Sequence, residues 1–269
     1  MSSNHLSYEV LESKPGAARR TAFLLHGILG SRRNWASMGR RLAQAHPEWR
    51  FVLVDLRGHG DSHGFSDAHT VEACALDIRA LTEEIGHTPE VMIGHSFGGK
   101  VALIYGRLRP PALKTIWSLD SPPGTDIVAS AMSIERVIET ARAAPTPFSH
   151  RLAAVPHFEA AGYQRAVAAW MTTNLKRGDG GFVWRFDLDI VQTLLEDYQK
   201  QSLWPFLEDL DRRVNVHFLL AGKSAWWRGP VEERLMALDR SFVHVLADAG
   251  HWVHMDDPDG LIEAISSAL

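Results

Sequence analysis

A serine stands at the centre of a Gly-x-Ser-x-Gly pattern in this chain of 269 residues. The pattern consists of Gly94, Ser96 and Gly98, and it follows an apolar run and precedes a helix-forming segment. Such a serine sits on a sharp strand-to-helix turn, where the glycines let strand and helix approach closely. The N–H of Phe97 begins that helix, where the helix dipole favours a developing oxyanion. We therefore predict Ser96 as a nucleophile and Phe97 as one oxyanion donor.

A phosphate-binding loop is the alternative interpretation of the same stretch. Gly94, Gly99 and Lys100 have the spacing of that motif, but Val101 stands where Mg²⁺ binding requires a serine or threonine. We therefore expect no nucleotide, and we interpret Lys100 as a solvated helix residue.

A loop of small residues, HGILG at residues 26–30, follows the first strongly apolar run. Such a loop lets a backbone N–H turn toward the nucleophile, and we predict Ile28 as this second oxyanion donor. We interpret the side chain of His26 as structural, holding the loop by hydrogen bonds. Leu29 in this loop, together with His95, Trp226 and Trp252, is a candidate for substrate contact.

His251 follows the last apolar run and is the predicted general base. A neutral imidazole with a pKa near neutrality can accept the serine proton and return it to a leaving group. His254 is the competing histidine, and we interpret it as partly buried and structural. The two histidines with Asp256 and Asp257 could also suggest a metal site, but no further ligand set is evident in the sequence. We expect no metal and no cofactor.

The carboxylate that should orient the histidine is harder to assign. The turn after the apolar run 214–221 reads GKSAW and holds no Asp or Glu. Asp120 ends the run 115–120, which should lie beside the nucleophile strand, and it is our choice for the acid. An Asp before Pro is also a common turn residue, and Asp248 is the next candidate.

The remaining pattern predicts an α/β protein. Apolar runs with the character of buried parallel strands lie at residues 21–25, 51–55, 91–94, 115–120, 214–221 and 242–246. Residues 6–11 suit an antiparallel edge strand. Residues 71–85 and 98–109 have helical spacing or helical context, and strand–helix alternation predicts a doubly wound sheet with its ligand site at the carboxyl ends of the strands.

Residues 122–213 interrupt this alternation and contain no convincing strand. Segments 133–144, 164–175 and 189–201 read as helices, with Trp and Phe scattered through them. The segment is too long for a simple crossover. We predict an α/β core at 1–121 and 214–269 with a helical cap inserted at 122–213.

Composition excludes several classes of protein. Apolar residues make up 45% of the chain, and 28 basic and 32 acidic residues give a net charge of −4 without a basic run, so no nucleic-acid surface is indicated. Cys74 is the only cysteine, which rules out a disulfide within one chain. With no secretory signal and no apolar stretch of membrane-spanning length in the sequence, we expect a cytoplasmic protein. The oligomeric state is left open.

The chain resembles the α/β-hydrolase superfamily in His26-Gly27, in the run DLRGHGDS at 55–62, in GHSFGGK at 94–100 and in Gly250-His251-Trp252. Three further stretches, SLDSP at 118–122, FLLAGKS at 218–224 and AGHWVH at 249–254, are similar to small bacterial esterases active on acyl-CoA and short esters and to their mitochondrial abhydrolase relatives. The resemblance implies a mostly parallel sheet of about eight strands flanked by helices, with a cap. It also supports Asp120 as the acid and implies that the loop at 57–60 is structural only.

Together the motifs predict a serine hydrolase that cleaves a small-molecule carboxylic ester or thioester through an acyl-serine. An Asp would be needed at position 96 for a haloalkane dehalogenase or an epoxide hydrolase. A carbon–carbon bond hydrolase or a cofactor-free lyase would keep the same triad and stays open. A non-catalytic ligand-binding receptor also stays open.

Overall fold

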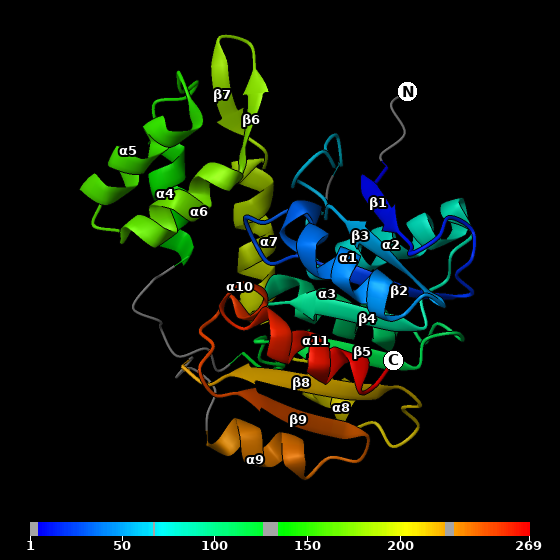
Figure 1. The fold of residues 1–269 in the computed structure, drawn as a ribbon. Helices are drawn as coiled ribbons and strands as arrows, with labels where there is room; N and C mark the ends of the chain where they lie inside the picture. The colour runs from blue at the N-terminus through cyan, green and yellow to red at the C-terminus, as the bar shows by residue number, and fades with distance from the viewer. Residues whose placement is uncertain (1–4, 67, 126–133, 224–228) are drawn as a thin grey trace.

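A seven-stranded sheet forms the centre of the protein in the computed structural model, which describes residues 5–66, 68–125, 134–223 and 229–269 (Figure 1). The strand order is β1-β3-β2-β4-β5-β8-β9, and only β1 runs antiparallel to its neighbour. The strands are β1 (Tyr8–Leu11), β2 (Arg20–Leu25), β3 (Trp49–Val54), β4 (Val91–His95), β5 (Thr115–Leu119), β8 (Asn215–Ala221) and β9 (Ser241–Leu246).

This sheet confirms the mostly parallel arrangement and the antiparallel edge strand expected from the sequence. It has seven strands within the described residues, where about eight were expected. The strands β4 and β5 are buried at every position, as their unbroken apolar sequences require.

Helices cover both faces of the sheet. The helices α1 (Ala36–Ala45) and α11 (Pro258–Ser266) pack on one face, where Trp35, Trp49 and Trp117 are fully buried. The helices α2 (Val71–Ile85) and α3 (Phe97–Arg107) pack on the other face. The predicted helix at 71–85 has the bounds of α2, which begins at its N-cap Thr70. None of the described helices is long and apolar enough to cross a membrane.

The strand order reverses direction between β2 and β4, because the chain first builds β3 on one side of β2 and then β4 on the other. Loops after parallel strands meet at the carboxyl edge of the sheet, and the crevice at such a reversal is where α/β proteins bind ligands. The loop at 26–30 follows β2 and Ser96 follows β4, so the sheet brings both motifs to this crevice.

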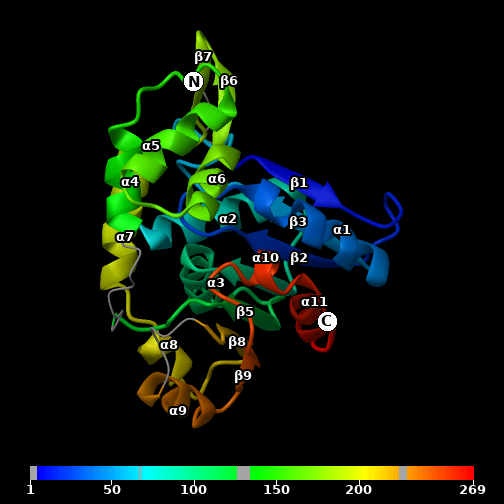
Figure 2. The same cartoon turned by 60° about the vertical axis from the view of Figure 1, so that its left-hand side comes forward.

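The segment between β5 and β8 contains six further helices within its described residues and one hairpin. The elements are α4 (Ile134–Arg142), a 3-10 helix (Arg151–Ala154), α5 (Val155–Ala160), α6 (Arg165–Thr173), β6 (Leu175–Gly178), β7 (Gly181–Trp184), α7 (Leu188–Lys200) and α8 (Trp204–Leu207). Figures 1 and 2 show α4, α5, α6 and the hairpin standing away from the sheet, while α7 returns toward it.

The hairpin of β6 and β7 corrects the expectation that this segment holds no strand. Its strands have four residues each and their sequences, LKRG and GFVW, are too short to show an alternating pattern. The turn signal was nevertheless present, since Asp179 is followed by Gly180 and Gly181, which both adopt positive φ.

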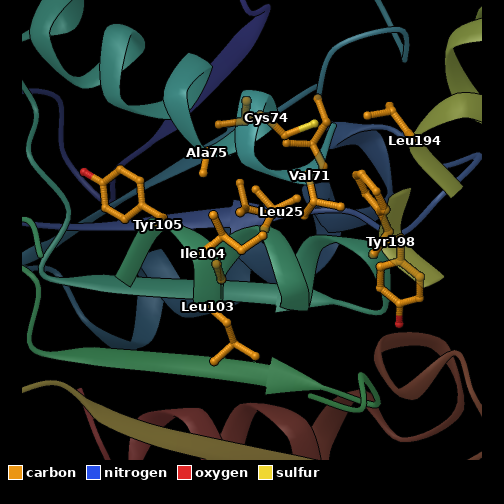
Figure 3. Close-up of a cluster of buried hydrophobic side chains, with 14 of the residues drawn as sticks. Leu25, Val71, Cys74, Ala75, Leu103, Ile104, Tyr105, Leu194 and Tyr198 are labelled. Atoms are coloured by element: carbon orange, nitrogen blue, oxygen red, sulfur yellow. The ribbon is translucent and has the colours of Figure 1, made fainter. Parts of the chain in front are cut away.

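Helix α7 joins the main core. Figure 3 shows Leu194 and Tyr198 of this helix beside side chains of α2 and of β2, including Val71 and Leu25. All four residues belong to one cluster of buried side chains. The β5–β8 segment is therefore anchored to the sheet through its last long helix.

Lys100 lies in this anchored region, and the expectation that it is solvated is wrong. Its side chain is completely buried in α3, and Nζ donates to the carbonyl oxygens of Gly124 at 2.8 Å, Tyr198 at 2.9 Å and Gln201 at 2.9 Å. The ammonium also lies 4.2 Å from the centre of the Tyr198 ring. Burial lowers the pKa of Lys100 to about 8. One cation thus joins α3 to both chain segments that connect the β5–β8 segment to the sheet.

Replacing this cation tests its contribution. Lys100→Met should lower the free energy of unfolding at pH 7 by about 2 kcal/mol, because three carbonyl groups lose a charged donor. Lys114→Met is the matched control, since Lys114 is 66% exposed and pairs with Glu90 on the surface. The control should change stability by less than about 0.5 kcal/mol. Urea denaturation measures both free energies of unfolding. Equal losses in the two variants would show that the buried contacts of Lys100 do not stabilise the fold more than a surface ion pair does.

Candidate active site

Ser96 occupies a strained turn between β4 and α3. Its backbone adopts φ 50° and ψ −116°, a conformation that L-residues rarely take. The flanking glycines explain how the turn closes. A Cβ at Gly94 would lie 2.1 Å from the carbonyl oxygen of Gly98, and a Cβ at Gly98 would lie 2.6 Å from that of His26. Only glycine fits at both positions, so the pattern reflects a steric requirement of this turn.

The loop at 26–30 lies directly against this turn. A Cβ built on Gly27 would be 3.4 Å from the Cβ of Ser96 and 3.0 Å from Nδ1 of His95. Among the described residues, the backbone N–H groups of Ile28 and Phe97 have no hydrogen-bond acceptor. These are the two N–H groups that the sequence analysis predicted as oxyanion donors. Neither is occupied by an acceptor among the described residues, so each can bind an oxygen atom of a ligand.

Two buried histidines hold the loop. The N–H of Leu29 donates to Nε2 of His59 at 3.1 Å, and the N–H of Leu56 donates to Nε2 of His26 at 3.0 Å. Each imidazole must be neutral to accept there. Burial lowers the pKa of His26 to about 4 and that of His59 to about 3. The structural interpretation of His26 agrees with these contacts.

His251 is bonded to Asp120. Its Nδ1 lies 2.7 Å from Oδ2 of Asp120, and the imidazole retains 24% of its exposure while the carboxylate is fully buried. A second oxygen of Asp120 accepts from the N–H of Ala221 at 3.2 Å. Asp248, the alternative acid, is exposed. The structure therefore pairs the histidine with the carboxylate at the end of β5.

Asp120 reaches this position through its own backbone conformation. It follows β5 directly, adopts φ 43° and donates its N–H to the carbonyl of Leu219 at 2.7 Å. Because β5 lies between β4 and β8, its carboxyl end faces both the serine turn and the chain that leads to His251. The penultimate strand β8 contributes a backbone donor to the carboxylate in place of an acid of its own.

His95 has a different environment from the one expected for a substrate contact. It is 4% exposed, its Nε2 lies 2.7 Å from the carbonyl oxygen of His251, and the ring centres are 4.7 Å apart. Burial, followed by the charges of His251 and His254, lowers the pKa of His95 well below its ordinary value. The neutral ring therefore donates from Nε2 to that carbonyl and ties the serine turn to the histidine loop.

His254 and the nearby carboxylates of Asp256 and Asp257 make contacts that stabilise the local fold. Burial lowers the pKa of His254 to about 4, and its ring lies 5.2 Å from that of Trp35. Asp256 accepts the N–H of Gly250, while Asp257 caps α11 through the N–H of Gly260. Within the described residues, no group of three or more His, Cys, Asp or Glu side chains has the geometry of a metal site.

The remaining candidates for substrate contact fall in three different places. Leu29 has no exposed surface and belongs to the main core cluster. Trp252 is partly exposed, and its ring centre lies 5.4 Å from that of Trp170 in α6. Trp226 lies outside the described residues. The contact between Trp170 and Trp252 shows that the β5–β8 segment lies next to the loop that carries His251.

The comparisons with known proteins agree with this architecture. A profile described as Alpha/beta hydrolase family matches residues 22–264. A mouse (Mus musculus) protein named sn-1-specific diacylglycerol lipase ABHD11 is 29% identical over 269 residues, covering 98% of this chain and 85% of that protein. Esterase YbfF from Escherichia coli (strain K12) is 25% identical over 249 residues, covering 91% of each chain. Among solved structures, one titled Marine microorganism esterase has a TM-score of 0.85 at 20% identity and covers 99% of this chain and 100% of its own.

The buried histidines make stability depend on pH. Since the folded pKa of His59, about 3, lies below its ordinary value, the unfolded chain takes up the proton first. The stability that the neutral ring contributes is complete above about pH 6.5 and is lost as the pH falls toward 3. His59→Gln keeps an acceptor for Leu29 but does not titrate. It should reduce the acid-side slope of the unfolding free energy by up to about 1.4 kcal/mol per pH unit.

Urea denaturation at pH 7, 6, 5 and 4 measures this slope. His5→Gln is the matched substitution at an exposed histidine, whose side chain is 53% exposed. If the unfolding free energy of His59→Gln depends on pH as steeply as that of the unsubstituted protein, the assignment of His59 as a neutral buried acceptor is wrong.

Proposed function

The chain belongs to the alpha/beta hydrolase family, and from this premise we propose that it is a serine hydrolase of carboxylic esters or thioesters. Ser96 is the nucleophile, His251 the general base and Asp120 the acid that orients it. The amides of Ile28 and Phe97 form the oxyanion hole. No cofactor takes part in the steps.

The bond between His251 and Asp120 is the observation that carries this proposal. An Nδ1–H that donates to the carboxylate over 2.7 Å fixes the tautomer in which Nε2 can accept a proton. The buried carboxylate also stabilises the imidazolium that forms after proton transfer. The ring packing of His251 against His95, the neighbour of Ser96, supports the placement of this base at the serine turn.

Acylation follows from these positions. His251 takes the proton of the Ser96 hydroxyl, and the oxygen attacks the carbonyl carbon of the ester. The negative charge of the tetrahedral intermediate develops on the carbonyl oxygen, where the free N–H groups of Ile28 and Phe97 stabilise it. Collapse of the intermediate expels the alcohol or thiol, which receives the proton from His251, and leaves an acyl-serine.

Deacylation repeats the same geometry with water. His251 takes a proton from the water molecule, whose oxygen attacks the acyl carbonyl within the same oxyanion hole. Ser96 recovers its proton when the carboxylic acid leaves. One oxyanion donor contributes about 3 kcal/mol to lowering the barrier in this class of reaction.

The elements between β5 and β8 are proposed to act as a cap over this site. The ring centres of Trp170 in α6 and of Trp252, the residue after His251, lie 5.4 Å apart, which brings this segment beside the proposed base. The relatives named as a diacylglycerol lipase and an esterase support an ester substrate.

Ser96→Ala tests the proposed nucleophile. The variant should lose at least about 10⁴-fold in kcat on 4-nitrophenyl butanoate, because no acyl-serine can form. It should also lose labelling by a fluorophosphonate probe. Ser37→Ala on the exposed face of α1 is the matched control and should keep both properties. Turnover retained by Ser96→Ala would sink the mechanism.

The two candidate acids are separated by a matched pair of substitutions. Asp120→Asn keeps the size of the side chain but favours the wrong histidine tautomer, so kcat should fall by about 10⁴-fold. Asp248→Asn changes an exposed residue and should leave kcat within about twofold. The reverse result in steady-state ester hydrolysis would move the acid to Asp248.

A further inference from the structure

Arg185 is a buried guanidinium with very little to bind. Its side chain is 9% exposed, and its one side-chain hydrogen bond to the described residues runs from Nη1 to Asp61 at 3.3 Å. Its Nε is buried without an acceptor among the described residues. A guanidinium carries five N–H donors, and burying it without partners is unfavourable.

Two other buried arginines of the protein make more hydrogen bonds than Arg185 does. Arg57 donates twice to Asp77, at 2.6 and 2.7 Å, and also to the carbonyl of Ala68. Arg212 donates to three carbonyl oxygens and to the hydroxyl of Ser241, although its Nε, like that of Arg185, has no acceptor among the described residues. Arg185 therefore differs from both in making a single side-chain hydrogen bond to the described residues.

The negative charges near Arg185, those of Asp61 and Asp55, are opposed by the positive charges of Arg33 and Arg151. Asp61 is shared with Arg32, which lies closer to it at 3.0 Å. Burial, and then the positive charge of Arg33, lower the pKa of Arg185. The neighbouring Asn174, whose carbonyl accepts the N–H of Arg185 at 2.7 Å, also has a buried Nδ2 without an acceptor among the described residues. Arg185 and Asn174, which this backbone hydrogen bond joins, thus each hold a buried donor without an acceptor among the described residues.

Arg185 and Asn174 lie where the proposed cap meets the loop at 57–60, which in turn contacts the loop at 26–30. Arg185 follows β7 directly, and two residues later the N–H of Asp187 donates to the carbonyl of Gly58 at 2.7 Å. His59, the residue after Gly58, accepts a hydrogen bond from the N–H of Leu29. One hydrogen-bonded loop therefore separates the unused donors from the loop that faces Ser96.

We propose that Arg185 and Asn174 form a subsite for an anionic group, a carboxylate or a phosphate, carried by the ester substrate. This proposal rests on the proposed ester hydrolysis at Ser96. A carboxylate or phosphate matches the planar fork of a guanidinium and supplies the acceptors that Nε of Arg185 and Nδ2 of Asn174 lack. The enzyme would accordingly prefer acidic esters to neutral esters of equal length.

Matched ester pairs test this preference. Mono-4-nitrophenyl esters of glutaric, adipic and pimelic acid carry a free carboxylate, and 4-nitrophenyl pentanoate, hexanoate and heptanoate are their neutral counterparts. After subtraction of uncatalysed hydrolysis, at least one acidic ester should exceed its neutral counterpart in kcat/KM by tenfold or more. Absence of any such preference across the three pairs overturns the proposal, without a need for any variant.

Two substitutions of opposite sign assign the preference to Arg185. Arg185→Gln should lower kcat/KM for the favoured acidic ester at least tenfold, mainly through KM, and change the neutral ester less than twofold. Asp61→Asn frees the guanidinium from its one carboxylate and should increase the acidic preference. Arg165→Gln, on an arginine whose side chain is 81% exposed, is the control and should change neither substrate. Equal losses on both esters in Arg185→Gln would mean a structural tie and would overturn the proposal.

A binding measurement separates this inference from the hydrolase reaction itself. Glutarate or inorganic phosphate should raise the Tm of the Ser96→Ala protein, and the double variant with Arg185→Gln should lose the shift. The anion with the larger shift identifies the subsite as carboxylate-binding or phosphate-binding. If no ester is cleaved but the shift depends on Arg185, the hydrolase assignment fails and the anion site stands. If esters are cleaved and neither anion binds, the anion site fails alone.

Discussion

The contact of α3 with β4 and with the loop after β2 is the constraint on which the rest of the site depends. This contact is possible only because positions 94 and 98 carry no Cβ, which would otherwise meet carbonyl oxygens at 2.1 and 2.6 Å. The turn forces Ser96 into an unfavourable backbone conformation and at the same time lifts its side chain out of the sheet edge. It also places Ser96 directly before the first residue of α3, Phe97. The strained backbone of Ser96 and its position at the start of α3 thus have one steric origin.

Neutral histidines stabilise the surroundings of that turn. His26 and His59 accept backbone N–H groups that would otherwise be buried without partners, and His95 donates to the backbone of His251. Burial lowers the pKa of each of these rings, so they stay uncharged while they serve as acceptors or donors. His251 differs because it is partly exposed and faces a carboxylate. The same side chain therefore has a structural role or a proposed catalytic role according to burial and partner.

The sequence was sufficient where the determinants are local. The glycine pattern around Ser96 and the apolar runs of β2, β4 and β5 are short-range features, and the strands lie where they were expected. The choice of Asp120 needed one further argument, that β5 neighbours β4, and its role as acid stays a prediction. Lys100 was misassigned because its three acceptors come from residues 24 to 101 positions away, which no helical pattern reveals. The hairpin was missed because four-residue strands carry too little periodicity.

Both long-range cations, Lys100 and Arg185, lie where the β5–β8 segment meets the sheet, but their surroundings differ. Lys100 is buried with three carbonyl acceptors and an aromatic ring, so its charge is compensated within the chain and holds the segment in place. Arg185 has one shared carboxylate at 3.3 Å and unused donors. A buried cation whose charge the chain compensates fully gains nothing from an external anion, whereas a cation that is compensated only in part is stabilised by binding one. This junction thus combines a fixed attachment near the serine turn with a position where a charged substrate would add the missing contact.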